Sequence, residues 1–104
     1  MADESIFFTP AAELARRFRA LELSPVEVIT AVLDRASRLQ ETLNCFITLI
    51  PDRALEEARR AEARFVAGCP LGSLDGIPFS VKDLVNTADV RTTFGTVALQ
   101  HNVP

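Results

Sequence analysis

The segment of residues 69–83 constrains the fold more than any other part of the chain. Its first half holds prolines, glycines and the pair Asp75-Gly76, all of which are typical of turns. Residues 77–82 follow with β-branched and aromatic side chains, which favour strands. Pro78 lies at the start of this stretch, where a missing N–H donor disturbs a sheet least. The sequence therefore predicts a tight turn and then a strand that ends at Lys82.

Lys82 is the candidate functional residue of this stretch. Because side chains alternate between the two faces of a strand, Lys82 shares a face with Ser80, opposite Phe79 and Val81. From the residues alone, two interpretations stay open. A lysine at a strand end is usually solvated, because lysines are almost never fully buried without a partner. Alternatively, a partly dry site lowers the pKa of the lysine, and its neutral amine acts as a base.

Residues 77–82, called the lysine segment below, are the last part of a strand–helix–strand pattern. Residues 45–50 predict another strand, and the helical pattern of residues 52–67 is ended by Gly68 in the usual place of a left-handed cap. This order favours an α/β fold, with the helix covering one face of a sheet. Ligands of open α/β sheets bind beyond the carboxyl ends of strands, which is where Lys82 lies. The helix is expected to pack through one stripe: Ala54, Ala58, Ala61 and Phe65.

Two amphipathic helices are predicted before this unit. Thr9 and Pro10 mark the start of the first helix, with the threonine as its N-cap. Ser24 and Glu27 have the spacing of a capping box at the start of the second helix. Both are interpreted as packing elements, through Leu14, Phe18 and Leu21 in the first and Val28, Ile29, Val32, Leu33, Ala36 and Leu39 in the second.

Length and composition narrow the classes of function. A chain of 104 residues, 48% apolar and 24% charged, forms at most one small globular domain. The net charge of −3 argues against nucleic acid or an anionic membrane as a partner. No apolar run approaches the length of a membrane span, and the acidic N-terminus does not resemble a signal peptide. The expected location is the cytoplasm.

Few residues of the sequence could bind a metal ion or act as a nucleophile. Cys45 and Cys69 lie far apart in sequence and His101 is the single histidine, so no zinc site is predicted, and no metal or cofactor is expected. Thr92, Thr93 and Thr96 carry hydroxyls, but no histidine–carboxylate pair stands near them in sequence. We expect these threonines to form hydrogen bonds within a loop.

Two ordered strings of residues resemble the amidase signature family. Residues 74–84 read Leu-x-Gly-Ile-Pro-x-x-Val-Lys-Asp-Leu, and residues 87–95 read Thr-Ala-x-Val-Arg-Thr-Thr-x-Gly, as in the lysine segment of that family. Residues 43–48 resemble a strand of the same family. The resemblance implies an α/β hydrolase that cleaves carboxamides with a serine nucleophile, a second serine in a cis peptide, and a lysine. It assigns the lysine, which serves as the base, to Lys82.

The resemblance covers only part of the family's machinery. Both serines belong to a later glycine- and serine-rich segment that this sequence does not contain, and neither Ser73 nor Ser80 matches them. Residues 1–104 are therefore expected to be an incomplete, N-terminal portion of a single amidase domain, and to be inactive alone. Two strands do not make a stable sheet, so we also expect the chain to self-associate.

Three functional hypotheses follow from the sequence. The first is part of a general amidase that acts on a small-molecule amide. The second is part of the A subunit of a glutamyl-tRNA(Gln)/aspartyl-tRNA(Asn) amidotransferase, which liberates ammonia from glutamine. The third is a non-catalytic interaction module in which Lys82 has no chemical role. The lysine segment alone does not distinguish the first two hypotheses.

Overall fold

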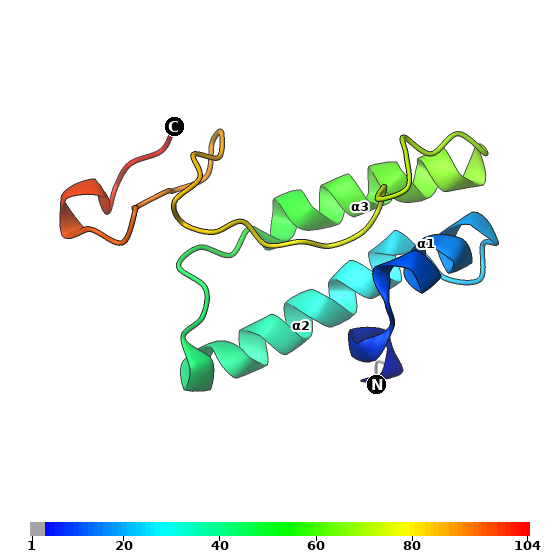
Figure 1. Ribbon diagram of the computed structural model, residues 1–104, viewed down its shortest axis with the longest axis horizontal. Helices are drawn as coiled ribbons and strands as arrows, with labels where there is room; N and C mark the ends of the chain where they lie inside the picture. The colour runs from blue at the N-terminus through cyan, green and yellow to red at the C-terminus, as the bar shows by residue number, and fades with distance from the viewer. Residues whose placement is uncertain (1–3) are drawn as a thin grey trace.

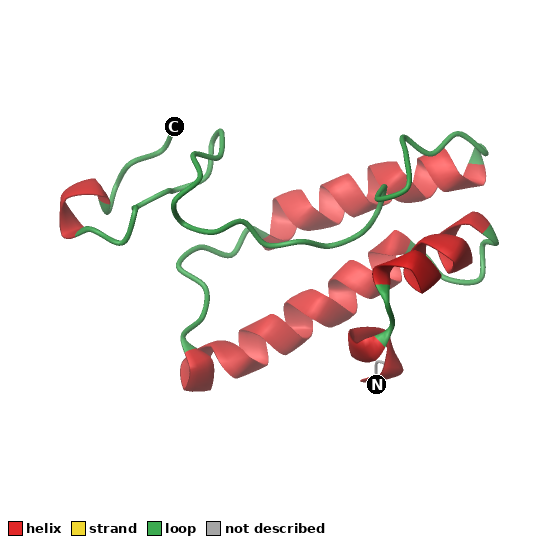
Figure 2. Cartoon of the chain, viewed as in Figure 1, coloured by secondary structure: helices red, strands yellow, loops and turns green. Residues whose placement is uncertain are grey.

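A computed structural model describes residues 4–104 of the chain, and its regular structure is helical (Figure 2). The elements in order are η1 (Glu4–Phe8), α1 (Ala11–Arg19), α2 (Pro25–Leu43), α3 (Pro51–Val66) and η2 (Val97–Leu99). Helices α2 and α3 lie side by side and form the main packing contact (Figure 1), and α1 also contacts α3. The two short 3-10 helices lie near the ends of the described chain.

The start of α2 confirms the predicted capping box. The Val26 N–H donates to Ser24 Oγ at 3.0 Å, and the Ser24 N–H donates to Glu27 Oε2 at 3.0 Å. These contacts satisfy backbone donors that a helix start leaves without partners. The Ser24 hydroxyl also donates to Glu62 on α3, so the cap joins the two long helices.

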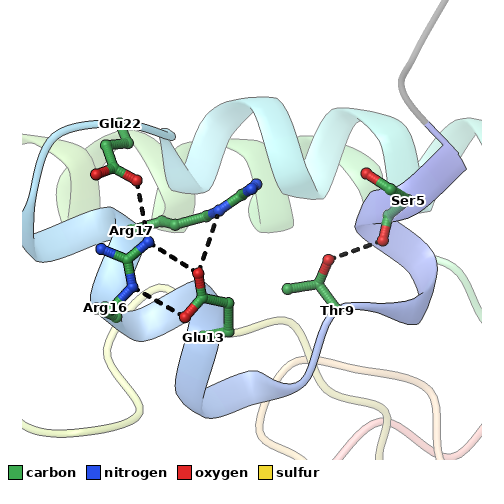
Figure 3. Close-up of polar contacts among 6 residues, drawn as sticks. All are labelled: Ser5, Thr9, Glu13, Arg16, Arg17 and Glu22. Atoms are coloured by element: carbon green, nitrogen blue, oxygen red, sulfur yellow. Dashed lines mark hydrogen bonds and ion pairs between the residues drawn. The ribbon is translucent and has the colours of Figure 1, made fainter.

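The prediction for the start of α1 was wrong by one residue. Pro10 is the N-cap of α1, and the hydroxyl of Thr9 instead donates to the carbonyl of Ser5 at 2.7 Å, back toward η1 (Figure 3). Further along α1, Glu13 pairs with Arg16 at 2.8 Å (Figure 3). A pair of exposed charges three residues apart on a helix adds little to stability, because water screens it.

The apolar core joins all three α-helices. Phe18 of α1 and Phe65 of α3 are buried with ring centroids 5.6 Å apart, and they cluster with Leu14 and Val28. Ala58 and Ala61 are buried as predicted, whereas Ala54 is half-buried and Leu39 of α2 is exposed. The predicted helix over 52–67 is confirmed as α3, shifted by one residue at each end.

The predicted strands over 45–50 and 77–82 were wrong. Within residues 4–104 the structure contains no strand, and its β pairing is an isolated bridge between Thr87 and Val90. Both predicted strands are extended or irregular loops, so the fold is mostly helical and contains no strand–helix–strand unit. The physical reason is that β-forming side chains become a strand only when a second strand pairs with the backbone, and no described residue pairs with these segments.

The lysine segment runs back along α3 toward the start of that helix (Figure 1). Gly76 fixes one end of this path, because a Cβ atom there would lie 2.8 Å from Pro25 Cγ and 3.3 Å from the Phe65 ring. Its φ of +80° is also a conformation that favours glycine. At the other end, the Arg53 guanidinium donates to the carbonyl of Ala88 at 3.0 Å. The chain between these two contacts carries Lys82.

Candidate functional site

Lys82 is exposed and lies at the end of an extended loop, where a strand had been predicted. It is the single lysine of the sequence. Its carbonyl accepts a hydrogen bond from the Val85 N–H at 3.0 Å, which closes a short turn after the lysine. Across residues 4–104, the Lys82 ammonium forms no ion pair. Among the described residues, Lys82 is thus exposed and has no ion-pair partner.

The lysine segment was predicted to have one apolar and one polar face, but in the structure the residues of both faces are exposed. Phe79 is 84% exposed and Val81 is 47% exposed, and Ser80 on the other face is exposed as well. The apolar cover that would make the surroundings of Lys82 dry is thus not supplied by residues 4–104. Ser80 lies close to Lys82 in sequence, but no hydrogen bond joins their side chains among the described residues.

Asp83, directly after Lys82, is held by hydrogen bonds to both its side chain and its backbone. Its carboxylate accepts hydrogen bonds from the Thr93 N–H at 2.8 Å, from the Thr93 hydroxyl, and from the Gly95 N–H at 3.3 Å. Its backbone carbonyl accepts from the Phe94 N–H at 3.0 Å. We call this set of contacts the Asp83–Thr93 clamp. The hydroxyl and then the N–H of Thr93 are the main causes that hold the pKa of Asp83 below its usual range.

A second set of hydrogen bonds holds the loop that carries Thr93. The Thr92 N–H donates to the Asn102 carbonyl at 2.9 Å, and the Asn102 amide donates to the Thr92 carbonyl, also at 2.9 Å. Thr92 and Thr93 are both buried. The Thr96 hydroxyl donates to the Thr93 carbonyl at 3.2 Å. The prediction that these threonines form hydrogen bonds within a loop is confirmed.

Arg91 connects the same loop to the segment before α3. Its guanidinium donates to the carbonyl of Ile47 at 3.1 Å and to the carbonyl of Gln100 at 3.2 Å. Residues 45–50 and 87–100 are thus held together by a side chain instead of by strand pairing. Arg91 and Asp83 both stand in the strings that resemble the amidase signature family, but sequence reasoning gave them no role. Their position inside those strings was the available signal.

The turn before the lysine segment is closed by a partly buried ion pair. Arg64 of α3 donates two hydrogen bonds to the Asp75 carboxylate, at 2.7 and 2.6 Å, and the Leu71 N–H donates a third at 3.0 Å. Asp75 has only 5% of its side chain exposed. The Arg64 guanidinium is the main cause that keeps the pKa of Asp75 below its usual range. Along the chain, Lys82 therefore lies between two carboxylates that are held by hydrogen bonds, Asp75 and Asp83.

The described residues contain neither a cluster of metal-binding side chains nor a helix that could cross a membrane. In residues 4–104, no group of three or more histidine, cysteine or acidic side chains is arranged to hold a metal ion. Cys45 and Cys69 are both free thiols at the surface. Among the helices of this part of the chain, none is both long and apolar enough to cross a membrane.

Comparison with known proteins shows the family to which this chain belongs. The family described as Amidase matches residues 27–104, which include α3, Lys82, the Asp83–Thr93 clamp and nearly all of α2. The chain is also similar to proteins named as the A subunit of glutamyl-tRNA(Gln) amidotransferase. The one from Aromatoleum aromaticum is 46% identical over 91 residues, 88% of this chain and 18% of that protein. The one from Thermosynechococcus vestitus is 41% identical over 92 residues, 88% of this chain and 19% of that protein.

A mitochondrial protein of the same name from Ornithorhynchus anatinus is 42% identical over 94 residues, 88% of this chain and 17% of that protein. The chain thus spans about a fifth of the length of the curated relatives that it matches. No solved structure matches it. The resemblance seen in the two strings around Lys82 is confirmed by a family match that extends back to the start of α2, and the chain belongs to the amidase family.

Proposed function

We propose that this chain supplies the general base, Lys82, of an active site that hydrolyses carbon–nitrogen bonds in carboxamides. The observation that carries the proposal is that the single lysine lies within the family match and forms no ion pair across residues 4–104. A lysine can act as a base only as the neutral amine, and an acidic partner would stabilise the ammonium instead.

The reaction needs groups that residues 1–104 do not provide. A serine nucleophile attacks the amide carbonyl, and its proton passes through a second serine to the amine of Lys82. Since neither Ser73 nor Ser80 matches those serines, we propose that residues 1–104 are part of a single amidase domain and are inactive alone. Exposed Phe79 and Val81 flank Lys82 in sequence. Covering these two side chains would exclude water from the surroundings of Lys82.

The names of the relatives favour one version of this function. All three relatives bear the name of the A subunit of glutamyl-tRNA(Gln) amidotransferase. We propose that the whole protein acts as such a subunit in the cytoplasm, with a small amide such as glutamine as its ammonia source and with other subunits as partners. A general amidase that acts on another small-molecule amide is the alternative.

The test uses a chimera in which this chain replaces the segment that it matches in the Aromatoleum aromaticum protein. Ammonia release is measured from glutamine and from a simple primary amide. Lys82→Ala is expected to lower turnover by about 10³-fold, which is within the range for loss of a general base. Lys82→Arg should be nearly as damaging, because a guanidinium does not give up its proton near neutral pH.

The matched control is Ser80→Ala, two residues away on the same exposed segment. It should leave turnover within about twofold, because its hydroxyl has no assigned role, and surface substitutions of this kind change stability little. Each variant is checked for native-like circular dichroism. A Lys82→Arg chimera that kept about a tenth or more of the parent turnover would remove the general-base assignment. Ammonia release from the simple amide but not from glutamine would favour the general amidase.

A further inference from the structure

Resting on the proposed function, we infer that Asp83 and Thr93 are positioning residues that hold Lys82 in place for proton transfer. Asp83 follows Lys82 directly, so the backbone of the lysine cannot move without moving the clamp. The carboxylate of Asp83 accepts from two N–H groups and one hydroxyl, and its carbonyl accepts from the Phe94 N–H at 3.0 Å. Contacts from both the side chain and the backbone fix the orientation of the residue.

The clamp is the nearest tertiary anchor to Lys82 along the chain. Among the described residues, no backbone N–H from Phe79 to Lys82 donates a hydrogen bond, because the predicted strand has no partner. The previous fixed point is Ile77, which packs against the core cluster around Phe18 and Phe65. The position of the amine therefore depends on Asp83 more than on the segment that leads to it.

The loop on the other side of the clamp is itself braced. Thr92 is 2% exposed and exchanges two hydrogen bonds of 2.9 Å with Asn102. Arg91 ties the loop to the carbonyl of Ile47. Because the Thr93 side of the clamp is held by these contacts, it acts as the fixed platform, and the Lys82–Asp83 backbone is the part that it positions.

The turn at the centre of the clamp adopts an unusual backbone. Phe94 and Gly95 have φ of +54° and +73°, in the left-handed region that a residue such as phenylalanine rarely adopts. A conformation of this kind persists only where the surroundings hold it. The hydrogen bonds from Thr93, Phe94 and Gly95 to Asp83 supply that restraint.

The clamp also directs the charge of Asp83 away from its neighbour. A carboxylate paired with Lys82 would stabilise the ammonium and oppose its role as a base. With its oxygens taken by Thr93 and Gly95, Asp83 forms no ion pair with Lys82 in residues 4–104. The charge of Arg91 is a minor cause of the lowered pKa of Asp83, after the hydrogen bonds from Thr93 and Gly95.

The test compares Asp83→Asn, Thr93→Val and Thr93→Ser in the same chimera. Turnover and KM are measured for the amide substrate, and hydrogen exchange of the amides of residues 93–95 is followed by mass spectrometry. Asp83→Asn and Thr93→Val should each speed this exchange and lower kcat by about tenfold or more, with KM within about threefold, because a small misplacement of a catalytic group is costly. Thr93→Ser keeps the hydroxyl and should stay within about threefold of the parent kcat.

Thr87→Val is the matched control, because it makes the same substitution in the same loop. In the described part of the chain, the Thr87 hydroxyl donates to the Val85 carbonyl at 3.3 Å and not to Asp83. Unchanged exchange at residues 93–95 in Asp83→Asn would overturn the clamp itself, whatever the activity. Faster exchange with unchanged kcat would overturn its positioning role. If Lys82→Ala kept full activity, the proposed function would fail, while the exchange measurement would still decide whether the clamp exists.

Discussion

Single residues in this chain act mainly as anchors for the segment that carries Lys82. Asp75 is the strongest example, because it is nearly buried and receives two hydrogen bonds from Arg64 and one from the Leu71 N–H. Asp83 has the same role on the other side of the lysine. Charge-assisted hydrogen bonds of this kind are stronger than neutral ones, so two carboxylates can hold a segment that has no sheet around it.

Asp75→Asn is predicted to destabilise the fold by about 2 kcal/mol at neutral pH, because it removes the charge that Arg64 binds. The pKa of Asp75 is lowered in the folded chain. The stabilisation by Asp75 is therefore fully present above the ordinary aspartate pKa, about 3.9, and is lost as the pH falls through the lowered folded value. The gap in the free energy of unfolding between parent and variant should shrink as the pH is lowered.

Urea unfolding of both proteins at neutral and acidic pH, at low protein concentration, measures this gap. Comparing the two proteins removes the contribution of Asp83, whose pKa is lowered as well. A gap that stayed constant from neutral pH down to a pH of about 2, well below the ordinary aspartate pKa, would contradict the assigned ion pair.

At the scale of elements, the sequence was a good guide to helices and a poor guide to strands. The capping box of Ser24 and Glu27 was predictable because every atom that it needs lies within one helical turn. The buried face of α3, which contains Phe65, was predictable because helix periodicity sets which face is apolar. These features depend on neighbours in sequence.

The strand segments could not be predicted in the same way. Residues 45–50 and 77–82 have strand-forming side chains, but strand formation depends on a partner elsewhere, and none pairs with them among residues 4–104. The contacts of Asp83 with Thr93 and of Arg91 with Ile47 replace that pairing. Their geometry was invisible in sequence because it depends on how two loops approach each other. Lys82 was predicted as the catalytic residue from the residues that surround it in sequence, and this role stays a prediction.

The packing of the lysine segment on α2 and α3 depends on one glycine. Gly76→Ala is predicted to destabilise the chain by about 2 kcal/mol or more, because it adds left-handed strain to a 2.8 Å overlap with Pro25. Gly68→Ala separates the two effects, since Gly68 has φ of +76° but open space around it, and should cost about 1 kcal/mol. Gly72→Ala has open space and no left-handed φ, so it should change stability by about 0.5 kcal/mol or less.

Urea unfolding ranks the three glycine variants under one condition. The expected order of destabilisation is Gly76, then Gly68, then Gly72. Equal losses for Gly76→Ala and Gly68→Ala would show that the contact with Pro25 contributes nothing, and that the lysine segment is not held against α2 as described.

At the scale of the whole molecule, large apolar side chains are left without cover. Phe79 is 84% exposed, Leu71 and Val97 are each 79% exposed, and Phe8 is 78% exposed. The core, by contrast, is a small cluster around Phe18 and Phe65. Exposed apolar surface of this kind marks places where a protein makes further contacts.

The isolated 104-residue chain is therefore predicted to self-associate as its concentration rises, because association removes these side chains from water. Size-exclusion chromatography with light scattering over a range of concentrations measures the effect. Phe79→Ser should shift the equilibrium toward monomer, whereas Thr30→Ala, at an exposed and polar position of α2, should not. A parent chain that stayed monomeric at all concentrations would contradict this prediction.

The central claim is that Lys82 acts as a base, and chemical rescue tests it most directly. In the Lys82→Ala chimera, added small primary amines should restore ammonia release from the amide substrate. The restored rate should rise with the concentration of the neutral amine and with its basicity, because a general base follows Brønsted behaviour. A guanidinium salt of similar size should not restore it, because that cation keeps its proton. If the guanidinium salt restored turnover as well as an amine did, Lys82 would contribute only positive charge, and its role as a base would be contradicted.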